Sequence, residues 1–370
     1  MTKVLSKMMS SFLVSLIFMM SSLSSVDSAA EVPAKPTPDQ PSVTCKSPDQ
    51  FNYGQWIPGA ENCGLLNKYK GATSVAQFSE WCWKPQGCEA VKFTAKGFCD
   101  LVAGKKILLI GDSLMYNMYE AFYHELESEG IQGPLQGDQW FYAQWPISKG
   151  KICNGRSQLV FLRNDHWLIS GEASDKHRIK RPVNMNWKGA LPVVDIVIMN
   201  KGHHVRSTEV TVQQFKDQTT EAIQYIKNYM LNERPKDTTK KQLSMYFLET
   251  SPGHALCKDS DTAITTPLLN REQYYKMLAQ YQHEKLSLMD SGYKYGWWDY
   301  ERHDEYIENL FTTQLNGTVI PVTHMTFLRP DGHVKTGDCL HYPCTTTPSV
   351  VDNWVFVFYN LLLNDKLFQQ

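Results

Sequence analysis

The stretch Lys106-Ile-Leu-Leu-Ile-Gly-Asp-Ser-Leu114 carries the clearest structural signal in the chain. Its first five residues are almost wholly apolar, as in a parallel strand that is covered on both faces. Gly111 ends this run. Apolar residues then recur at helical spacing up to Gly130, namely Met115, Met118, Tyr119, Phe122 and Leu126. The stretch therefore predicts a buried strand that turns directly into a helix.

The same alternation continues toward the C-terminus. Further strands are predicted at Gln158–Leu162, Val193–Met199, Leu243–Leu248 and Val319–Phe327, the last of them weakened by Pro321. Helices are predicted at Glu209–Leu231, Arg271–Met289 and Val350–Leu363. Alternating strands and helices indicate an α/β fold with a mainly parallel sheet and helices on both faces. Ligands of such folds bind beyond the carboxyl ends of the strands.

Composition excludes several classes of protein. The chain has 370 residues, of which 42% are hydrophobic, and this fraction is too high for a disordered protein. Lys and Arg number 37 and Asp and Glu 38, so the formal net charge is -1. A chain this balanced has no general attraction to nucleic acid or to an anionic membrane. No nucleic-acid partner is expected.

The N-terminal third predicts a secretory protein. Residues 1–30 have two lysines, an apolar centre at Phe12–Met20 and the small residues Ser28-Ala29-Ala30, as in a signal peptide. An uncleaved signal anchor is the alternative, and only an anchor would attach the chain to a membrane. Against it, serines interrupt the apolar run, which makes the run a poor membrane span. Residues 31–44 form a Pro-rich linker, residues 45–100 an irregular Cys- and Trp-rich segment packed on the main domain, and residues 101–370 the α/β domain. The mature protein is expected to be secreted or to reside in the Golgi lumen.

The nine cysteines are expected to form disulfides in that oxidising compartment, with one left over. Their spacing includes no Cys-x-x-Cys and does not suit zinc. His203 and His204 are adjacent and have no acidic residue near them in the sequence, so no metal and no cofactor are expected. Asn316-Gly317-Thr318 is a candidate glycosylation acceptor.

Ser113 is the first candidate for chemistry. It lies between a buried strand and a helix N-terminus, where unpaired backbone N–H groups can stabilise an oxyanion. Simple capping of the helix by Ser113 is the alternative. Asn200 and Gly202 follow the strand Val193–Met199 and could supply further oxyanion donors, or form an ordinary β-turn.

A serine nucleophile needs a base and a group that orients the base. Asp338 and His341 are three residues apart, close enough for the carboxylate to fix the imidazole tautomer. Cys339 and Cys344 flank this loop and can attach it to the body of the domain.

Several ordered motifs together resemble one family. Gly111-Asp-Ser-Leu114 is similar to the first block of the GDSL/SGNH hydrolase superfamily, and Asp338-Cys-Leu-His341 to its late Asp-x-x-His block. The match is best with the PC-esterase group, which includes the plant trichome birefringence-like proteins. Motifs that carry this similarity are Trp83-Lys-Pro85, Asn200-Lys-Gly-His203, Leu328-Arg-Pro-Asp-Gly-His333 and Asp352-Asn-Trp354, so it runs from about Cys45 to the C-terminus.

The resemblance implies a three-layer α/β/α domain that acts on O-acetyl groups of polysaccharides. It makes Ser113 the nucleophile, His341 the base and Asp338 its orienting acid, with Ser113, Asn200 and Gly202 forming the oxyanion hole. It also implies the disulfides Cys45–Cys88, Cys257–Cys339 and Cys63–Cys344. The expected activity is O-acetyl transfer from an acyl donor to a polysaccharide through an acyl-serine, and a small molecule is the candidate donor.

Two alternatives remain open. An O-acetylesterase would use the same triad with water as the acceptor. A catalytically inactive glycan-binding wall protein would use exposed aromatic residues, for which Trp140, Trp145, Trp297 and Trp298 are the candidates.

Overall fold

The computed structural model describes residues 43–65, 81–131, 147–170, 184–205, 210–237, 242–254, 257, 300–333, 338–342 and 349–368. All of them belong to one compact unit that spans Ser42–Gln370. The predicted signal segment, most of the linker, the predicted helix Arg271–Met289 and all four of the candidate glycan-binding tryptophans lie outside the described residues.

The centre of the unit is a six-stranded sheet with the strand order β4-β5-β3-β6-β7-β8. Its strands are β3 (Lys106–Gly111), β4 (Ile147–Ile152), β5 (Ser157–Arg163), β6 (Ile196–Met199), β7 (Ser244–Leu248) and β8 (Thr318–Ile320). Neighbouring strands are parallel except at the edge, where β4 runs antiparallel to β5. The expected mainly parallel sheet is therefore confirmed.

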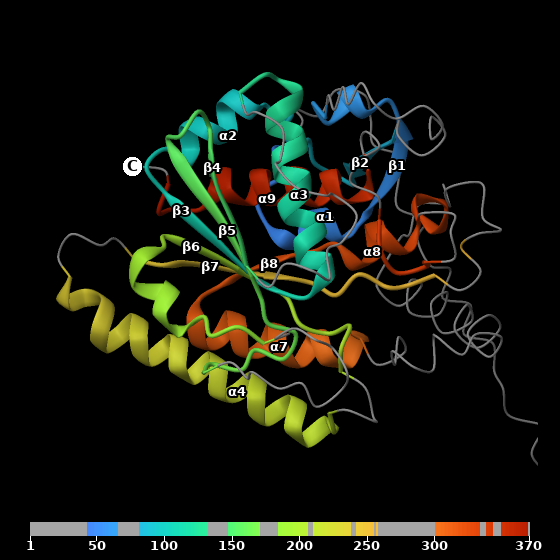
Figure 1. The fold of residues 1–370 in the computed structure, drawn as a ribbon. Helices are drawn as coiled ribbons and strands as arrows, with labels where there is room; N and C mark the ends of the chain where they lie inside the picture. The colour runs from blue at the N-terminus through green and yellow to red at the C-terminus, as the bar shows by residue number, and fades with distance from the viewer. Residues whose placement is uncertain are drawn as a thin grey trace, which may run out of the picture. The chain divides into compact units, whose positions relative to one another are not determined.

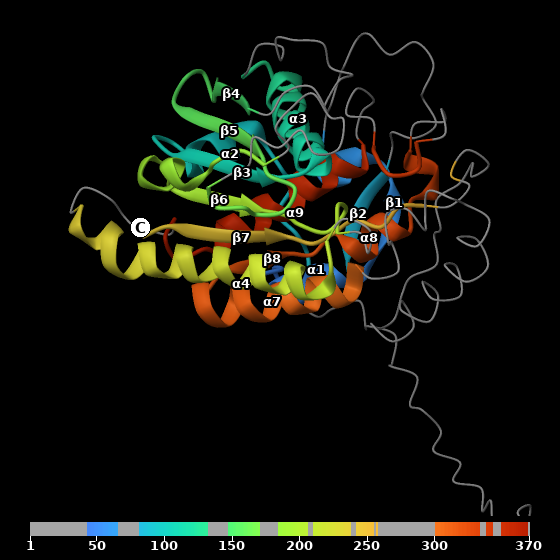
Figure 2. The same ribbon diagram turned by 60° about the horizontal axis from the view of Figure 1, so that its bottom comes forward.

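Helices cover both faces of this sheet (Figures 1 and 2). On one face, α3 (Ser113–Ser128) lies beside α9 (Val350–Asn364), and on the other, α4 (Val212–Asn228) lies beside α7 (Tyr300–Leu315). Alternate residues of β3 enter different cores, because successive side chains of a strand point to opposite faces: Ile107 and Leu109 pack with α3 and α9, and Leu108 and Ile110 with α4 and α7. The three-layer α/β/α fold follows from this continuous apolar pattern.

The turn from β3 into α3 depends on two residues. A Cβ on Gly111 would lie 2.3 Å from the side-chain oxygen of Asn200, so only glycine allows this close approach. Asp112 then caps α3, because its carboxylate accepts a hydrogen bond from the backbone N–H of Leu114 (2.9 Å). The helix continues to Ser128, and Gly130 follows in a left-handed conformation with a φ of 70°.

Two predicted strands differ from the observed ones. The segment Val319–Phe327 is not one strand: β8 ends at Ile320 and the helix α8 (Thr323–Phe327) follows. Pro321 has no N–H to continue the ladder, which explains the early end. Likewise, β6 begins only at Ile196, because Lys188–Val193 form a 3-10 helix.

Residues 45–100 contain more regular structure than the sequence suggests. The strands β1 (Gly54–Pro58) and β2 (Trp81–Pro85) form an antiparallel pair, and α1 (Pro48–Asn52) and α2 (Ala95–Leu101) flank them. Asn353 of α9 attaches this segment to the main domain, since its side-chain oxygen accepts from the backbone N–H of Trp83 (2.9 Å). The regular elements of this segment are short, between 3 and 7 residues each, and its expected packing on the main domain is observed.

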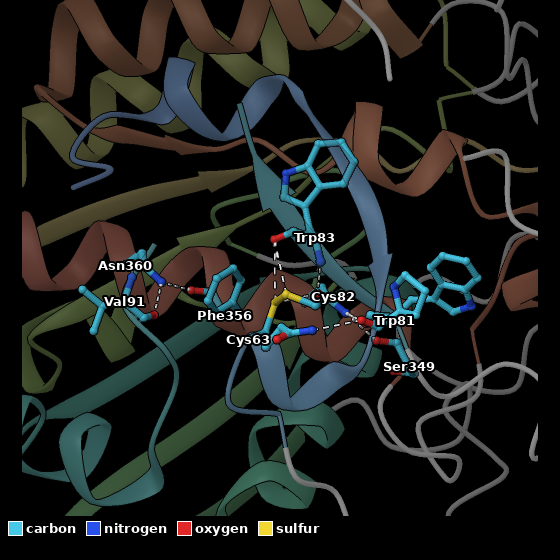
Figure 3. Close-up of a disulfide and its surroundings, with 11 residues drawn as sticks. Cys63, Trp81, Cys82, Trp83, Val91, Ser349, Phe356 and Asn360 are labelled. Carbon is cyan, nitrogen blue, oxygen red and sulfur yellow. Dashed lines mark hydrogen bonds between the residues drawn. A yellow bond between two sulfur atoms is a disulfide. The ribbon is translucent and has the colours of Figure 1, made fainter. Parts of the chain in front are cut away.

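Four disulfides join described cysteines. They include the two implied pairs Cys45–Cys88 and Cys257–Cys339, together with Cys99–Cys153. The implied pair Cys63–Cys344 is wrong, because Cys63 is bonded to Cys82, with the two Cα atoms 5.5 Å apart (Figure 3). Pairing of β1 with β2 brings Cys82 close to Cys63, just after β1. Cys344 lies outside the described residues.

Among the helices that the structure describes, none has the length and hydropathy that a membrane span needs.

Candidate active site

Ser113 lies at the first position of α3, directly beyond the carboxyl end of β3, and only 7% of it is exposed. Helix geometry leaves its backbone N–H without an intrahelical partner. The capping role is taken by the neighbouring Asp112, so the Ser113 hydroxyl is not needed to cap the helix.

His341 and Asp338 meet Ser113 in space, although 228 positions separate the serine from the histidine. The Nε2 atom of His341 lies 2.6 Å from the Ser113 hydroxyl oxygen, and its Nδ1 atom lies 2.7 Å from Asp338 Oδ2. The carboxylate of Asp338 accepts also from the backbone N–H groups of Leu340 and His341 (3.1 Å each). Burial alone would raise the pKa of Asp338, but the hydrogen bond and charge of His341 outweigh it and hold this pKa below its usual range.

The ionised Asp338 determines which nitrogen of His341 carries the proton. A carboxylate can only accept, so Nδ1 donates to it and Nε2 is left to accept the proton of the Ser113 hydroxyl. The three side chains therefore form one hydrogen-bond chain, with the geometry that a serine nucleophile and its base require.

Several contacts fix the loop that carries His341. The Cys257–Cys339 disulfide attaches it to the segment after β7, and the backbone N–H of His254 donates to the Cys339 carbonyl (2.8 Å). The carbonyl of His341 itself lies 2.9 Å from Nδ1 of His333.

Asn200 contacts the same strand-to-helix turn and carries an unpaired donor. Its side-chain oxygen accepts from the backbone N–H of Asp112 (3.2 Å), which fixes the orientation of the amide. Its Nδ2 atom is buried and has no hydrogen-bond partner among the described residues. A buried amide donor without a partner is unusual, so this atom is suited to bind an oxygen of a ligand.

Gly202 lies on the same loop and packs tightly on Thr250. A Cβ on Gly202 would lie 2.2 Å from the Thr250 hydroxyl oxygen, so this position needs glycine. The Thr250 hydroxyl in turn donates its single proton to Asp304 (2.7 Å), and the carbonyl oxygen of Lys201 lies 3.2 Å from the same hydroxyl oxygen. The loop that follows β6 is thus attached to β7 and α7.

Trp167 is a residue of the site that sequence reasoning missed. Its indole N–H donates to the backbone carbonyl of Asn200 (2.8 Å), and its side chain is fully buried. Its φ of 59° is in the left-handed region, which is a costly conformation for so large a residue. Its position in the loop after β5, at the same sheet edge as Ser113, was the available signal.

The two adjacent histidines do have acidic partners in space, contrary to the sequence-based expectation. Nδ1 of His203 lies 2.7 Å from Asp112, and Nε2 of His204 lies 3.6 Å from Asp165. These carboxylates come from other strand ends, which the sequence around the histidines cannot show. Within the described ranges, no three His, Cys, Asp or Glu side chains form a group that could hold a metal ion.

The candidate acceptor Asn316 is exposed, in the turn between α7 and β8.

A mainly parallel sheet between two helical layers, with a serine at the strand-to-helix turn of its carboxyl edge, defines an SGNH-like α/β/α protein. Residues 91–361 match the PC-esterase family, described as the GDSL/SGNH-like acyl-esterase family found in Pmr5 and Cas1p. This match covers more than half of the chain, and the protein belongs to the PC-esterase family.

Curated relatives of the chain include plant proteins. The chain is 26% identical to protein trichome birefringence-like 18 of Arabidopsis thaliana over 195 residues, which cover 48% of this chain and 36% of the relative. It is 37% identical to xyloglucan O-acetyltransferase 2 of Arabidopsis thaliana over 153 residues, or 40% of this chain and 35% of the relative. It is 21% identical to protein trichome birefringence-like 9 of the same plant over 385 residues, which cover 85% of this chain and 83% of the relative. The chain thus spans about a third of the length of the first two relatives.

Proposed function

We propose that this protein is a serine-dependent polysaccharide O-acetyltransferase. The observation that carries the proposal is the chain of hydrogen bonds from the Ser113 hydroxyl through His341 to Asp338, at 2.6 and 2.7 Å. Membership of the PC-esterase family and similarity to relatives named xyloglucan O-acetyltransferases support the acyl chemistry and the class of acceptor.

The first half of the reaction forms an acetyl-serine. Nε2 of His341 takes the proton as the Ser113 oxygen attacks the acetyl carbonyl carbon of the donor. The resulting oxyanion is bound by the backbone N–H groups of Ser113 and Gly202 and by Nδ2 of Asn200. The tetrahedral intermediate then collapses, the protonated His341 gives its proton to the leaving group, and the acetyl group stays on Ser113.

The second half transfers the acetyl group. A hydroxyl of the polysaccharide gives its proton to Nε2 of His341 and attacks the acetyl carbonyl, and the same donors bind the second oxyanion. Collapse breaks the bond to Ser113, whose oxygen recovers the proton from His341. Asp338 remains ionised throughout and keeps Nδ1 of His341 as a donor. Water in place of the sugar hydroxyl would make the same site an esterase.

The proposal is tested by trapping the intermediate. The full chain, expressed through the secretory pathway so that its disulfides form, is mixed with p-nitrophenyl acetate and quenched for mass spectrometry. We expect one acetyl group on the peptide that contains Ser113, none in the Ser113→Ala variant, and an unchanged adduct in the control Ser170→Ala. An adduct that persists in Ser113→Ala would reassign the nucleophile, and absence of any adduct or turnover would favour the inactive glycan-binding alternative.

The acceptor is identified by single-turnover analysis with a xyloglucan oligosaccharide. Acetylated oligosaccharide as the product supports a transferase, whereas free acetate as the sole product would establish an esterase.

We further propose that residues 1–30 are a cleaved signal peptide, that residues 31–44 are a linker, and that the mature protein acts in the Golgi lumen or after secretion. The four disulfides support a folding compartment that is oxidising. Mass spectrometry of the mature N-terminus tests this: a terminus near Ala30 is expected, and an intact Met1 end would favour the anchor.

A further inference from the structure

His203 is a buried residue that directly follows Gly202 and contacts three other segments. Its Nδ1 atom lies 2.7 Å from the carboxylate of Asp112, and its Nε2 atom lies 2.9 Å from the backbone carbonyl oxygen of Ser251, beyond β7. The ring of Tyr300, at the start of α7, packs edge-on against it at 5.2 Å between centroids. Both His203 and Asp112 are only 1% exposed.

The two contacts of the His203 ring decide its charge. A carbonyl oxygen can only accept a hydrogen bond, and so can an ionised carboxylate. Each ring nitrogen therefore has to donate, which requires a proton on both of them. The Ser251 hydroxyl, which could donate to Nε2, lies further away at 3.5 Å.

We propose that His203 is a permanent imidazolium, and that it acts as a positioning residue by neutralising Asp112 and joining the ends of β3, β6 and β7 around the oxyanion site.

The electrostatic surroundings agree with this assignment. Burial lowers the pKa of His203, but the charge and hydrogen bond of Asp112 outweigh it and hold this pKa above its usual value. Asp112 responds in the opposite direction: burial would raise its pKa, but His203 holds it below the usual range. The other titratable groups near the pair are Asp165, His204 and Arg163, and Arg163 binds Asp165 through two hydrogen bonds of 2.9 and 3.0 Å.

The inference rests on the proposed function, because neutralisation matters only if negative charge develops next to Ser113. Asp112 directly precedes Ser113 in the chain, so an uncompensated carboxylate there would oppose the oxyanion of each tetrahedral intermediate. His203 likewise directly follows Gly202, whose backbone N–H is a proposed donor. The ion pair between His203 and Asp112 thus removes this repulsion. It also holds the two neighbouring oxyanion donors, Ser113 and Gly202, in position relative to each other.

The charge of His203 can be measured without any turnover. In the full chain labelled with 15N, long-range proton–nitrogen correlation spectra are recorded between pH 6 and 8, and the His203 signals are identified by their loss in the His203→Gln variant. We expect both ring nitrogens of His203 to carry protons throughout this range. A ring nitrogen without a proton would overturn the proposal.

Kinetics test the positioning role. His203→Gln should lower kcat for p-nitrophenyl acetate about 100-fold, as loss of an oxyanion contact does, and KM should stay within about threefold because the change acts on the transition state. The double variant Asp112→Asn/His203→Gln removes both charges and should recover about 10-fold in kcat, since the two groups act as one unit.

The control is His324→Gln, a buried histidine of α8 whose Nδ1 contacts the carbonyl of Asn52, and which should keep both kinetic constants. Wild-type kcat in His203→Gln, or a double variant no more active than the single one, would overturn the positioning role. Failure of the proposed function would be seen in a different experiment. In that case Ser113→Ala would keep its turnover, while the NMR spectra would still show both ring nitrogens of His203 protonated.

Discussion

Replacement of Asn200 offers the sharpest test of how the site binds an oxyanion. Its side chain has two separable roles: Oδ1 accepts from the backbone N–H of Asp112 at 3.2 Å, and Nδ2 is buried without a partner among the described residues. Asn200→Ala removes both atoms, while Asn200→Asp keeps an acceptor oxygen of the same shape and removes only the donor. The relative activities of the two variants therefore show whether catalysis depends on the Nδ2 donor or on the Oδ1 acceptor of Asn200.

The expected sizes follow from these contacts. Loss of one oxyanion donor lowers kcat by about 10²- to 10³-fold, or about 2.7–4 kcal/mol in the barrier. In Asn200→Asp, a carboxylate oxygen about 3 Å from the oxyanion would add a repulsion of about 5 kcal/mol at an effective dielectric constant of about 20. The Asp variant should thus be less active than the Ala variant. Asn200→Ala should also lower the free energy of unfolding by about 1 kcal/mol, because it removes the acceptor of the Asp112 backbone N–H.

The assay measures kcat and KM with p-nitrophenyl acetate, together with urea unfolding of each variant. Asn309→Ala, an exposed position on α7, is the matched control and should keep wild-type kinetics. If Asn200→Asp were more active than Asn200→Ala, or if Asn200→Ala kept kcat within threefold, Nδ2 would not bind the oxyanion and Asn200 would serve only to hold Asp112.

Three further predictions concern the elements that support the site. Trp167→Phe removes the donor to the Asn200 carbonyl (2.8 Å) and should lower the unfolding free energy by about 1–3 kcal/mol and kcat about 10-fold, measured by urea unfolding and kinetics; an unchanged kcat would contradict a positioning role. Replacing Cys257 and Cys339 by Ala opens a link between positions 82 residues apart, for which chain entropy predicts a loss of about 4–5 kcal/mol in urea unfolding; wild-type stability would contradict this. Burial raises the pKa of Asp352 to about 7, so the folded protein holds a proton that the unfolded chain releases near pH 4, and stability should fall as pH rises from about 4 to 7. Thermal melts of Asp352→Asn should show a flatter dependence on pH, and an unchanged slope would refute the assignment.

The sequence predicted the elements whose pattern is local. The apolar run Lys106–Ile110 and the helical spacing after it gave the correct strand, turn and helix, because burial on both faces requires a continuous apolar strand. Val350–Leu363 similarly matches α9, whose residues are buried over nearly its whole length. Segments that depend on distant partners were missed, such as the pairing of β1 with β2 and the antiparallel edge strand β4.

The disulfides show the same difference between what a local sequence pattern predicts and what depends on distant partners. Cys45–Cys88 and Cys257–Cys339 followed from the family resemblance, but the partner of Cys63 did not. Its bond to Cys82 depends on the register of β1 with β2, in which Ile57 lies opposite Cys82. Register is a property of two segments together, so one segment alone cannot predict it.

The amino-acid sequence by itself determined which residue types stand at the strand ends, and hence the fold class and the candidates Ser113, Asp338 and His341. Only the packing of β5, β3 and β6 decided that Trp167 supports Asn200 and that Asp112 meets His203. The physical reason is that periodic burial is encoded within one element, whereas a distance of 2.6 Å between Ser113 and His341 requires several elements to pack at once.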